Sequence, residues 1–204
     1  VHTNLVPFFR KRNYQHPLPA DPERFLALVE LLYTTGLRRG DGCQFQADFI
    51  DPHDFHYQAV QTQTGIEVSV GIPEALAAKL RSLAPLPWRG ADPNYPNAGR
   101  YIFWDGTGDA DDEVFKKYMD NVIGRPLREL GNSLNIPGLR PHRLRDSFAV
   151  NSLLSGLTMD EVSRLLGHKS VKTTERYYCP KVLSRVRLLL DRQKALRRPF
   201  LIAS

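Results

Sequence analysis

The segment from residue 142 to 180 places the strongest constraint on the fold, because helix start and stop signals divide it into short helices. Thr158 and Glu161 have the spacing of a capping box, and Gly167 fits the end of the helix that this box begins. A helix over residues 143–155 precedes it and is closed by a glycine. This part of the chain is therefore predicted to be helical.

Upstream, the pattern changes from helical to strand-like and back. Asp21 is placed as the N-cap and Gly36 as the stop of an amphipathic helix. Alternating runs at residues 55–60 and 66–70, joined by the turn sequence QTQTG, predict an antiparallel hairpin. The other predicted elements are a buried run at 101–104 and helices at about 41–51, at 73–83, from 112 with an interruption at Pro126, from 170, and at 182–196. We therefore expect a mixed α+β fold, mainly α-helical with a small antiparallel β-sheet.

Composition indicates an anionic partner inside the cell. The 204 residues include 28 Lys and Arg against 22 Asp and Glu, a formal net charge of +6. Such a balance favours nucleic acid as the partner. Two widely separated cysteines, Cys43 and Cys179, argue against a disulfide framework and for a reducing compartment. The sequence has neither a signal-peptide pattern nor an apolar run long enough to cross a membrane, so we expect a cytoplasmic protein.

Arginine, histidine and tyrosine side chains gather near the predicted helix ends. His142 and Arg145 are three residues apart, so they share one face of a helix. His168 follows the glycine that ends a helix, and a tyrosine pair lies in the next helix. Arg38 follows the stop of the first long helix. Each residue alone has a simpler explanation, such as a helix-terminal charge or a packed aromatic ring.

Three motifs in this order resemble the boxes of the tyrosine recombinase (phage integrase) family, in its catalytic domain. Residues 35–41, TGLRRGD, are similar to the box T-G-L-R-x-x-E. Residues 142–149, HRLRDSFA, are similar to H-x-L-R-x-[ST]-F-A. Residues 165–168, LLGH, precede the tyrosine pair at the spacing of the third box. The resemblance extends over residues 21–180 and implies the DNA breaking-rejoining fold of that family.

The resemblance implies a transesterification on DNA that conserves the energy of the phosphodiester bond and needs neither a cofactor nor a metal. Arg38 and Arg145 would hold the non-bridging phosphate oxygens with forked donors, and Asp41 would hold Arg38 in place. His142 would act near the nucleophile as a base or a hydrogen-bond partner, and His168 would bond a phosphate oxygen. A tyrosine would attack and form a 3′-phosphotyrosine.

Two adjacent tyrosines compete for the role of nucleophile. The sequence TERYYCPKV resembles the family pattern T-E-R-H-Y-x-P-W-V, in which the tyrosine stands just before x-P. This alignment selects Tyr178 and leaves Tyr177, in the histidine position, as the alternative nucleophile; Lys181 replaces the tryptophan. Adjacent helical residues point about 100° apart, so both cannot attack.

One position departs from the family pattern. The family usually carries a lysine in a K-T-G-like hairpin tip, where it protonates the leaving 5′-oxygen. This chain has Gln63 there, in the sequence Q-T-G, and no lysine lies between Arg39 and Ala78. Glutamine donates a hydrogen bond but is not a comparable acid. The substitution therefore predicts either a weakened enzyme or another proton donor.

The same resemblance implies the domain organisation and the partners. We expect an irregular N-terminal arm at residues 1–20, the catalytic domain at 21–180, and a basic helical tail at 181–204 that packs on a neighbouring subunit. The partners are then double-stranded DNA and further copies of this chain in a tetramer, with no membrane. The setting is a prokaryotic mobile genetic element, with the protein in the cytoplasm and associated with the nucleoid.

Three other interpretations compete. Residues 158–178 also fit a helix-turn-helix DNA reader without catalysis. The chemistry is shared with type IB topoisomerases, which relax DNA. The two arginines and two histidines favour an enzyme over a reader, and the short layout favours the recombinases. The sequence DPHDFH, with His53 and His56 beside Asp51 and Asp54, could suggest a metal site, but solvated polar residues in a turn are favoured there.

Overall fold

The computed structural model describes residues 8, 14–61, 63–95, 97–108 and 113–196. Within these residues the chain is mainly helical, with one two-stranded antiparallel sheet, which confirms the predicted fold class. The strands are β1 (His56–Val60) and β2 (Glu67–Gly71). The helices are α2 (Pro17–Ala20), α3 (Pro22–Thr35), α4 (Arg39–Cys43), α5 (Glu74–Ser82), α6 (Glu113–Met119), α7 (Arg125–Ser133), α8 (Pro141–Leu154), α9 (Met159–Leu166) and α10 (Val171–Leu196).

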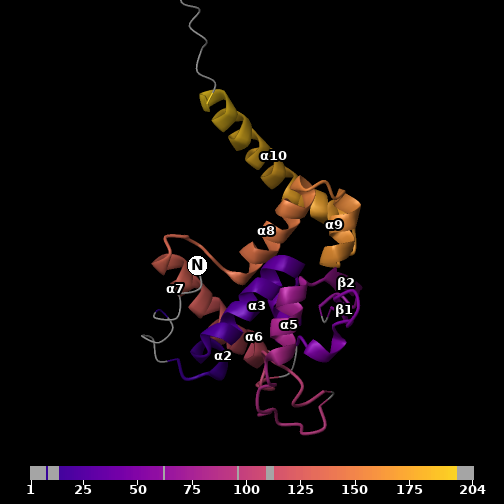
Figure 1. Ribbon diagram of the computed structural model, residues 1–204, viewed down its shortest axis with the longest axis vertical. Coiled ribbons are helices and arrows are strands. Elements are labelled where there is room, and N and C mark those ends of the chain that lie inside the picture. Colours follow the sequence, from indigo (N-terminus) through magenta and orange to yellow (C-terminus); the bar gives the residue numbers. More distant parts are fainter. Residues whose placement is uncertain (1–7, 9–13, 62, 96, 109–112, 197–204) are drawn as a thin grey trace, which may run out of the picture.

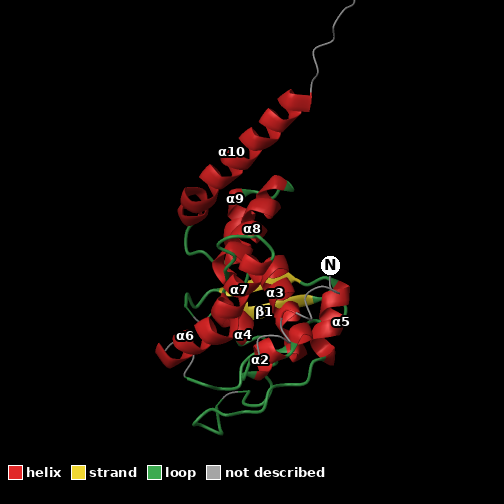
Figure 2. Ribbon diagram, turned by 90° about the vertical axis from the view of Figure 1, so that its left-hand side faces the viewer, coloured by secondary structure: helices red, strands yellow, loops and turns green. Residues whose placement is uncertain are grey.

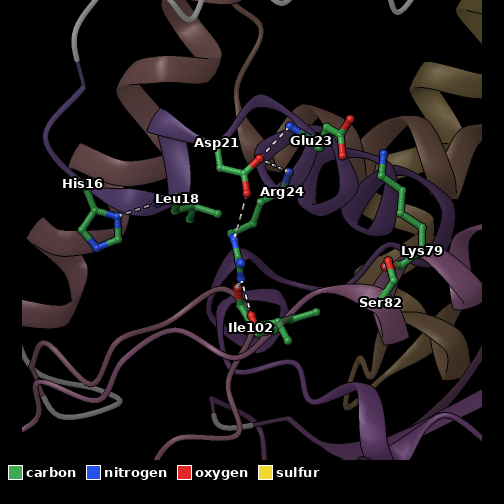
Figure 3. A network of polar contacts seen from close by, with 9 residues as sticks. His16, Leu18, Asp21, Glu23, Arg24, Lys79, Ser82 and Ile102 are labelled. Atoms are coloured by element: carbon green, nitrogen blue, oxygen red, sulfur yellow. Dashed lines mark hydrogen bonds and ion pairs between the residues drawn. The ribbon is translucent and has the colours of Figure 1, made fainter.

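Helix α3 lies at the centre of the molecule and packs against α2, α4, α5 and α8 (Figure 1). Its Asp21 cap has the predicted role, because the carboxylate accepts hydrogen bonds from the backbone N–H groups of Glu23 and Arg24 at 3.0 and 3.1 Å (Figure 3). Such a cap contributes about 1 kcal/mol. The Arg24 guanidinium also donates to the carbonyl of Ile102 at 2.7 Å, which ties α3 to the buried run at 101–104 (Figure 3).

The C-terminal end of α3 is shaped by a glycine that also allows close helix packing. Gly36 has a φ of 66°, in the left-handed region, and its backbone N–H bonds the carbonyl of Leu32. A Cβ at this position would lie 2.3 Å from the ring of Phe148 in α8. The chain therefore turns sharply here and delivers Arg38 to the junction between α3 and α8.

The hairpin pairs His56 with Gly71 and Val60 with Glu67, and residues 61–66 connect the strands. The first strand begins one residue later than the predicted range 55–60, and the second is shifted by one residue from the predicted range 66–70. Tyr57, Val68 and Val70 point to the core, so the alternation of buried and exposed positions follows the sequence pattern. Strand β2 also contacts α9, which brings the hairpin connection close to the end of that helix.

The predicted helix at 41–51 is wrong, since the structure has α4 at Arg39–Cys43 and a separate 3-10 turn at Ala47–Phe49. Tertiary packing explains the break. Gly42 faces Leu32 so closely that a Cβ would lie 2.6 Å from its side chain. The chain then leaves the helix to bury Phe45 against Tyr57, with ring centroids 4.3 Å apart.

The predicted pair of helices after residue 170 is also wrong, because α10 runs without a break from Val171 to Leu196. Pro180 lies inside it, although proline removes a helical hydrogen bond. The carbonyl of Arg176 loses its helical partner because Pro180 has no N–H group. Both residues are exposed, so water can bond that carbonyl. The hydroxyl of Ser184 donates to the Pro180 carbonyl at 2.9 Å.

Three other expectations meet the structure as follows. Residues 17–20 form α2, a helix rather than irregular chain, with Leu18 fully buried. Pro126 follows a π-helical turn at Asp120–Gly124, which interrupts the α-helical pattern between α6 and α7 as predicted. The capping box of α9 is present, with the Thr158 hydroxyl and the Glu161 carboxylate bonded to each other's backbone N–H groups.

The apolar core has two parts. The larger surrounds α3 and includes the hairpin, α5, α6 and the run at 101–104. The smaller lies between α8, α9 and α10 and consists of Ala149, Val150, Val162, Leu166 and Tyr178. Beyond it, the second half of α10 extends away from the other elements (Figures 1 and 2). Each helix in the described part of the chain is too short or too polar to traverse a lipid bilayer.

Candidate active site

One open pocket of about 640 Å³ brings together all the side chains that the sequence singled out for chemistry. They come from the turn after α3, from α4, the hairpin connection, α8, the α9–α10 turn and α10. These lining residues are Arg38, Asp41, Gln63, His142, Arg145, His168, Tyr177 and Tyr178. Segments separated by more than a hundred residues therefore meet at one cavity.

Arg145 forms the buried floor of this site, with 3% of its surface exposed. Its guanidinium donates to the carbonyl of Gly36 at 2.6 Å and to the carbonyl of Leu166 at 2.5 Å. Burial, and then the neighbouring charge of Arg38, lowers the pKa of Arg145 to about 10. The charge of Arg38 beside this buried guanidinium favours the binding of an anion between the two arginines.

Arg38 stands at the N-terminus of α4, where Gly36 has just turned the chain. Burial lowers the pKa of Arg38, and the nearby Asp41 carboxylate acts in the opposite direction. Asp41 is 8% exposed. The carboxylate thus stabilises the charge of Arg38 from the protein side, while the pocket side is open to a ligand.

A buried glutamine that sequence reasoning did not single out, Gln61, contacts Arg38 and the backbone carbonyl that anchors Arg145. Its Oε1 accepts a hydrogen bond from Arg38, and its Nε2 donates to the carbonyl of Leu166 at 3.0 Å. That carbonyl also accepts from Arg145. The sequence offered no signal for this role beyond the position of Gln61 at the root of the hairpin connection, because its partners are distant along the chain.

His168 is held neutral beside the arginines. Gly167, with a φ of 61°, ends α9 and turns the chain so that His168 lines the pocket. Its Nδ1 lies 2.9 Å from the hydroxyl of Thr174. Burial, followed by the charges of Arg145 and Arg38, lowers the pKa of His168 to about 4. The ring is therefore uncharged at neutral pH.

The two tyrosines differ sharply in burial. Tyr178 is 2% exposed and belongs to the smaller core, with its ring stacked 6.3 Å from that of His168. Tyr177 is 57% exposed, although it also lines the pocket. Burial, followed by the Asp146 carboxylate, raises the pKa of Tyr178 to about 12, and Arg145 acts against this shift.

Asp146 links the first turn of α8 to α10 beside Tyr178. Its Oδ2 pairs with Lys181 at 2.7 Å, and its Oδ1 is 3.6 Å from Nε2 of His142. The Lys181 ammonium also lies 5.0 Å from the centroid of the Tyr178 ring. Lys181, which stands where the family pattern has tryptophan, thus packs on the ring of Tyr178.

The hairpin connection presents Gln63 to the pocket as an exposed side chain. The lysine that does line the pocket, Lys116, comes from α6 and pairs with Glu113 at 2.7 Å. Sequence reasoning did not identify Lys116, because α6 is distant from the motifs along the chain. Three further arginines on the pocket wall, Arg39, Arg128 and Arg140, extend the positive charge.

The polar cluster at 51–56 serves the turn that precedes β1. The Asp51 carboxylate accepts from the backbone N–H groups of His53 and Asp54 at 2.7 and 3.2 Å. His56 pairs with Asp54 at 2.8 Å. In the described part of the chain, no group of three or more histidine, cysteine or acidic side chains is arranged to hold a metal ion.

Curated relatives match the chain over most of its length. It is 32% identical over 165 residues to the tyrosine recombinase XerC of Bifidobacterium longum, and 28% identical over 160 residues to the tyrosine recombinase XerA of Pyrococcus furiosus. Each alignment covers 78% of this chain but only 44% and 51% of the two relatives. The chain thus spans about half the length of the curated relatives that it matches.

Solved structures share the fold. The recombinase XerH, in a post-cleavage complex with its difH substrate, superposes with a TM-score of 0.59 at 15% identity, covering 93% of this chain and 50% of that one. The XerA recombinase superposes with a TM-score of 0.57 at 23% identity, covering 87% and 55%. The family model described as the phage integrase family matches residues 12–182. This chain belongs to the phage integrase family, the tyrosine recombinases.

Proposed function

We propose that this chain is the catalytic domain of a site-specific DNA recombinase, which cleaves and rejoins strands through a 3′-phosphotyrosine. The Tyr178 hydroxyl attacks a backbone phosphorus, and the 5′-oxygen leaves and becomes a free hydroxyl. A 5′-hydroxyl of another strand then attacks the phosphotyrosine and releases the tyrosine. One phosphoester bond is exchanged for another at each step, so no energy source is consumed.

The observation that carries this proposal is the meeting of Arg38, Arg145 and Tyr178 at one pocket. Attack on phosphorus builds negative charge on the non-bridging oxygens, and two guanidiniums can bind them with paired N–H donors. The lowered pKa of Arg145 supports this role, since an entering phosphate would relieve the repulsion between the two cations.

The two histidines take different roles in this scheme. Nδ1 of His168 faces Thr174, which leaves Nε2 of the neutral ring to bond a phosphate oxygen. The raised pKa of Tyr178 keeps the phenol protonated until attack. His142 is the proposed acceptor of that proton. Asp146 lies beside both His142 and Tyr178 and orients this end of the site.

The proposed substrate is double-stranded DNA in the cytoplasm, where strand exchange requires several copies of the chain together. The solved relative XerH is described as bound to its difH substrate, and the basic pocket wall here suits a phosphate backbone. The named relatives support recombination over DNA relaxation. The exposed apolar face of α10 is the proposed contact to a neighbouring subunit, with a tetramer as the working assembly.

Trapping the covalent intermediate tests the function and the nucleophile together. Nicked duplexes with a randomised central sequence serve as suicide substrates, because the short cleaved strand diffuses away before religation. We expect an adduct with the wild-type chain and with Tyr177→Phe, and none with Tyr178→Phe. An adduct that survives Tyr178→Phe and disappears in Tyr177→Phe would move the nucleophile by one residue. No adduct from the wild-type chain on any substrate would overturn the enzymatic proposal.

A further inference from the structure

Gln61 is a fully buried polar side chain at the point where the hairpin meets the active-site pocket. Its amide uses both of its functions. The oxygen accepts from Arg38 and from the hydroxyl of Thr64, the latter at 3.1 Å, and the nitrogen donates to the Leu166 carbonyl at 3.0 Å. A buried amide with its hydrogen bonds satisfied holds its neighbours in one geometry, because leaving any partner unpaired there is costly.

These bonds connect the two arginines through the Gln61 side chain and the Leu166 carbonyl. The Leu166 carbonyl that Gln61 contacts also accepts from Nη2 of Arg145. Arg38, Gln61, Leu166 and Arg145 therefore form one continuous chain of hydrogen bonds across the floor of the pocket. A shift of the Gln61 amide would change the direction of the Arg38 guanidinium and the environment of the carbonyl that anchors Arg145.

The backbone of Gln61 also shapes the hairpin connection. Its carbonyl accepts from the N–H of Gly65 at 2.8 Å, and its N–H donates to the Ile66 carbonyl at 2.9 Å. Gln63, which lines the pocket, lies within the turn that these bonds close. The residue that orients Arg38 thus also sets the position of the hairpin side chain that faces the substrate.

The glycine at the end of α9 accommodates this arrangement. A Cβ on Gly167 would lie 2.4 Å from Oε1 of Gln61, so the close approach of the amide requires a glycine there. The same glycine has a φ of 61° and turns the chain towards His168. The contact therefore joins the hairpin to the α9–α10 turn, within the third motif and next to His168.

We infer that Gln61 is a positioning residue that aligns both arginines and the hairpin turn for the scissile phosphate. This inference rests on the proposed function, since it names the group that holds the proposed phosphate-binding pair. Gln61 acts through the arginines and does not touch the substrate. An amide is required because it accepts from a guanidinium and donates to a carbonyl at once. Methionine has no donor and accepts only weakly, and a carboxylate would repel the Leu166 carbonyl.

The first experimental arm does not depend on catalysis. Gln61→Met keeps an unbranched side chain of similar length, and Gln58→Met is the matched control at an exposed position of β1. Side-chain NMR of the arginines, with the Arg38 signal assigned by its loss in Arg38→Lys, reports whether that guanidinium is held. We expect faster guanidinium rotation and exchange for Arg38 in Gln61→Met, and no change in Gln58→Met, with both variants folded by thermal unfolding.

The second arm measures adduct formation on the suicide substrates selected by the wild-type chain. In Gln61→Met we expect the cleavage rate to fall by roughly 10–100-fold, as for other groups that orient the residues contacting the substrate, with DNA affinity within a few-fold. A 5′-thiol leaving group should not restore the rate, because the defect lies in phosphate binding rather than in leaving-group protonation. Gln61→Glu, which keeps the acceptor for Arg38 but loses the donor, should also be slow.

Distinct outcomes separate the two proposals. Equal cleavage by Gln61→Met and Gln58→Met, or full recovery with the 5′-thiol, would overturn the positioning role while leaving the proposed function intact. If the wild-type chain forms no adduct, the proposed function fails, and the NMR arm alone decides whether Gln61 holds Arg38. Unchanged Arg38 signals in both Gln61 variants would overturn the inference.

Discussion

At the residue scale, Arg145 serves both the fold and the proposed chemistry. Its guanidinium joins the end of α3 to the end of α9 through the carbonyls of Gly36 and Leu166, in a nearly dry environment. Arg38 makes fewer structural contacts and is half-buried. The two arginines should therefore respond differently to the same substitution.

Lysine at either position retains the charge but loses the fork of N–H donors. We expect Arg38→Lys and Arg145→Lys to abolish adduct formation while DNA binding stays within a few-fold. Arg145→Lys should also lower the thermal unfolding midpoint by several degrees, because a buried hydrogen bond from a charged group contributes about 1.5–3 kcal/mol. Adduct formation at a near wild-type rate by either variant would remove the phosphate-binding assignment.

His168 provides a test of the electrostatics without DNA. Its lowered pKa, about 4, means that the folded state binds fewer protons than the unfolded state between roughly pH 4 and 6.5. The contribution of His168 to stability is therefore complete above this window and is lost as the pH falls through it. We expect the ring signals in an NMR titration to move only below pH 5.

Arg38→Gln should raise the pKa of His168, because it removes one of the two arginine charges that disfavour the imidazolium. Arg39→Gln, on the wall of the same pocket, is the matched control. It should raise the pKa of His168 less than Arg38→Gln does. A wild-type ring that titrates near pH 6.5 would contradict the buried, cation-flanked environment.

At the scale of elements, the hairpin connection carries the departure from the family pattern. If glutamine limits protonation of the leaving 5′-oxygen, Gln63→Lys should accelerate cleavage several-fold, and a 5′-thiol substrate should remove the difference between the two proteins. Single-turnover adduct formation measures both rates. No gain with the ordinary substrate would mean that another residue supplies the acid. Lys116 is the candidate on the pocket wall, and Lys116→Met should then be slow except with the 5′-thiol.

Local signals decided the elements whose ends are capped by their own neighbours. The ends of α3 and α9 agree with the predictions because Asp21, Gly36, Thr158 and Gly167 act on residues within the same turn. The region at 41–51 failed this reasoning because its helix ends in order to bury Phe45 against the hairpin. The prediction of two helices after residue 170 failed in the opposite direction, since α10 continues through Pro180, where exposure to solvent tolerates the missing hydrogen bond.

At the scale of the whole molecule, the second half of α10 extends away from the other described elements (Figure 2). It carries exposed apolar side chains. Its exposed side chains are Leu183, Val186, Leu188, Leu189 and Leu190. Lys181 and Val182, by contrast, contact Asp146 and the smaller core. The part that is free to meet another subunit therefore begins after these two residues.

Truncation after Ser184 should separate assembly from folding. We expect the shortened chain to keep its thermal unfolding midpoint within a few degrees, because Tyr178, Lys181 and Val182 remain. It should fail to form higher-order complexes on DNA, as measured by light scattering after gel filtration. The double variant Leu183→Glu with Leu190→Glu should behave in the same way, whereas Arg185→Glu, on the opposite face of the same helix, should still assemble. Unchanged assembly by the truncated chain would exclude this role for the tail.

The residues that line the candidate site, and most of the elements that carry them, could be predicted from the sequence. The motifs around Arg38, His142, Arg145 and His168 could be identified because each is a short run whose residues act together locally. The same runs predicted a mainly helical fold with one hairpin, since helix caps and strand alternation depend on near neighbours.

The contacts that hold these groups depend on the tertiary packing and could not be predicted from local patterns. Gln61 reaches the Leu166 carbonyl across 105 positions of sequence, and Lys116 enters the pocket from a helix without any motif. The burial that separates Tyr178 from Tyr177 comes from the packing of α10 on α8 and α9. Contacts of this kind depend on which segments pack together, and that is settled by the burial of the whole core rather than by any local pattern.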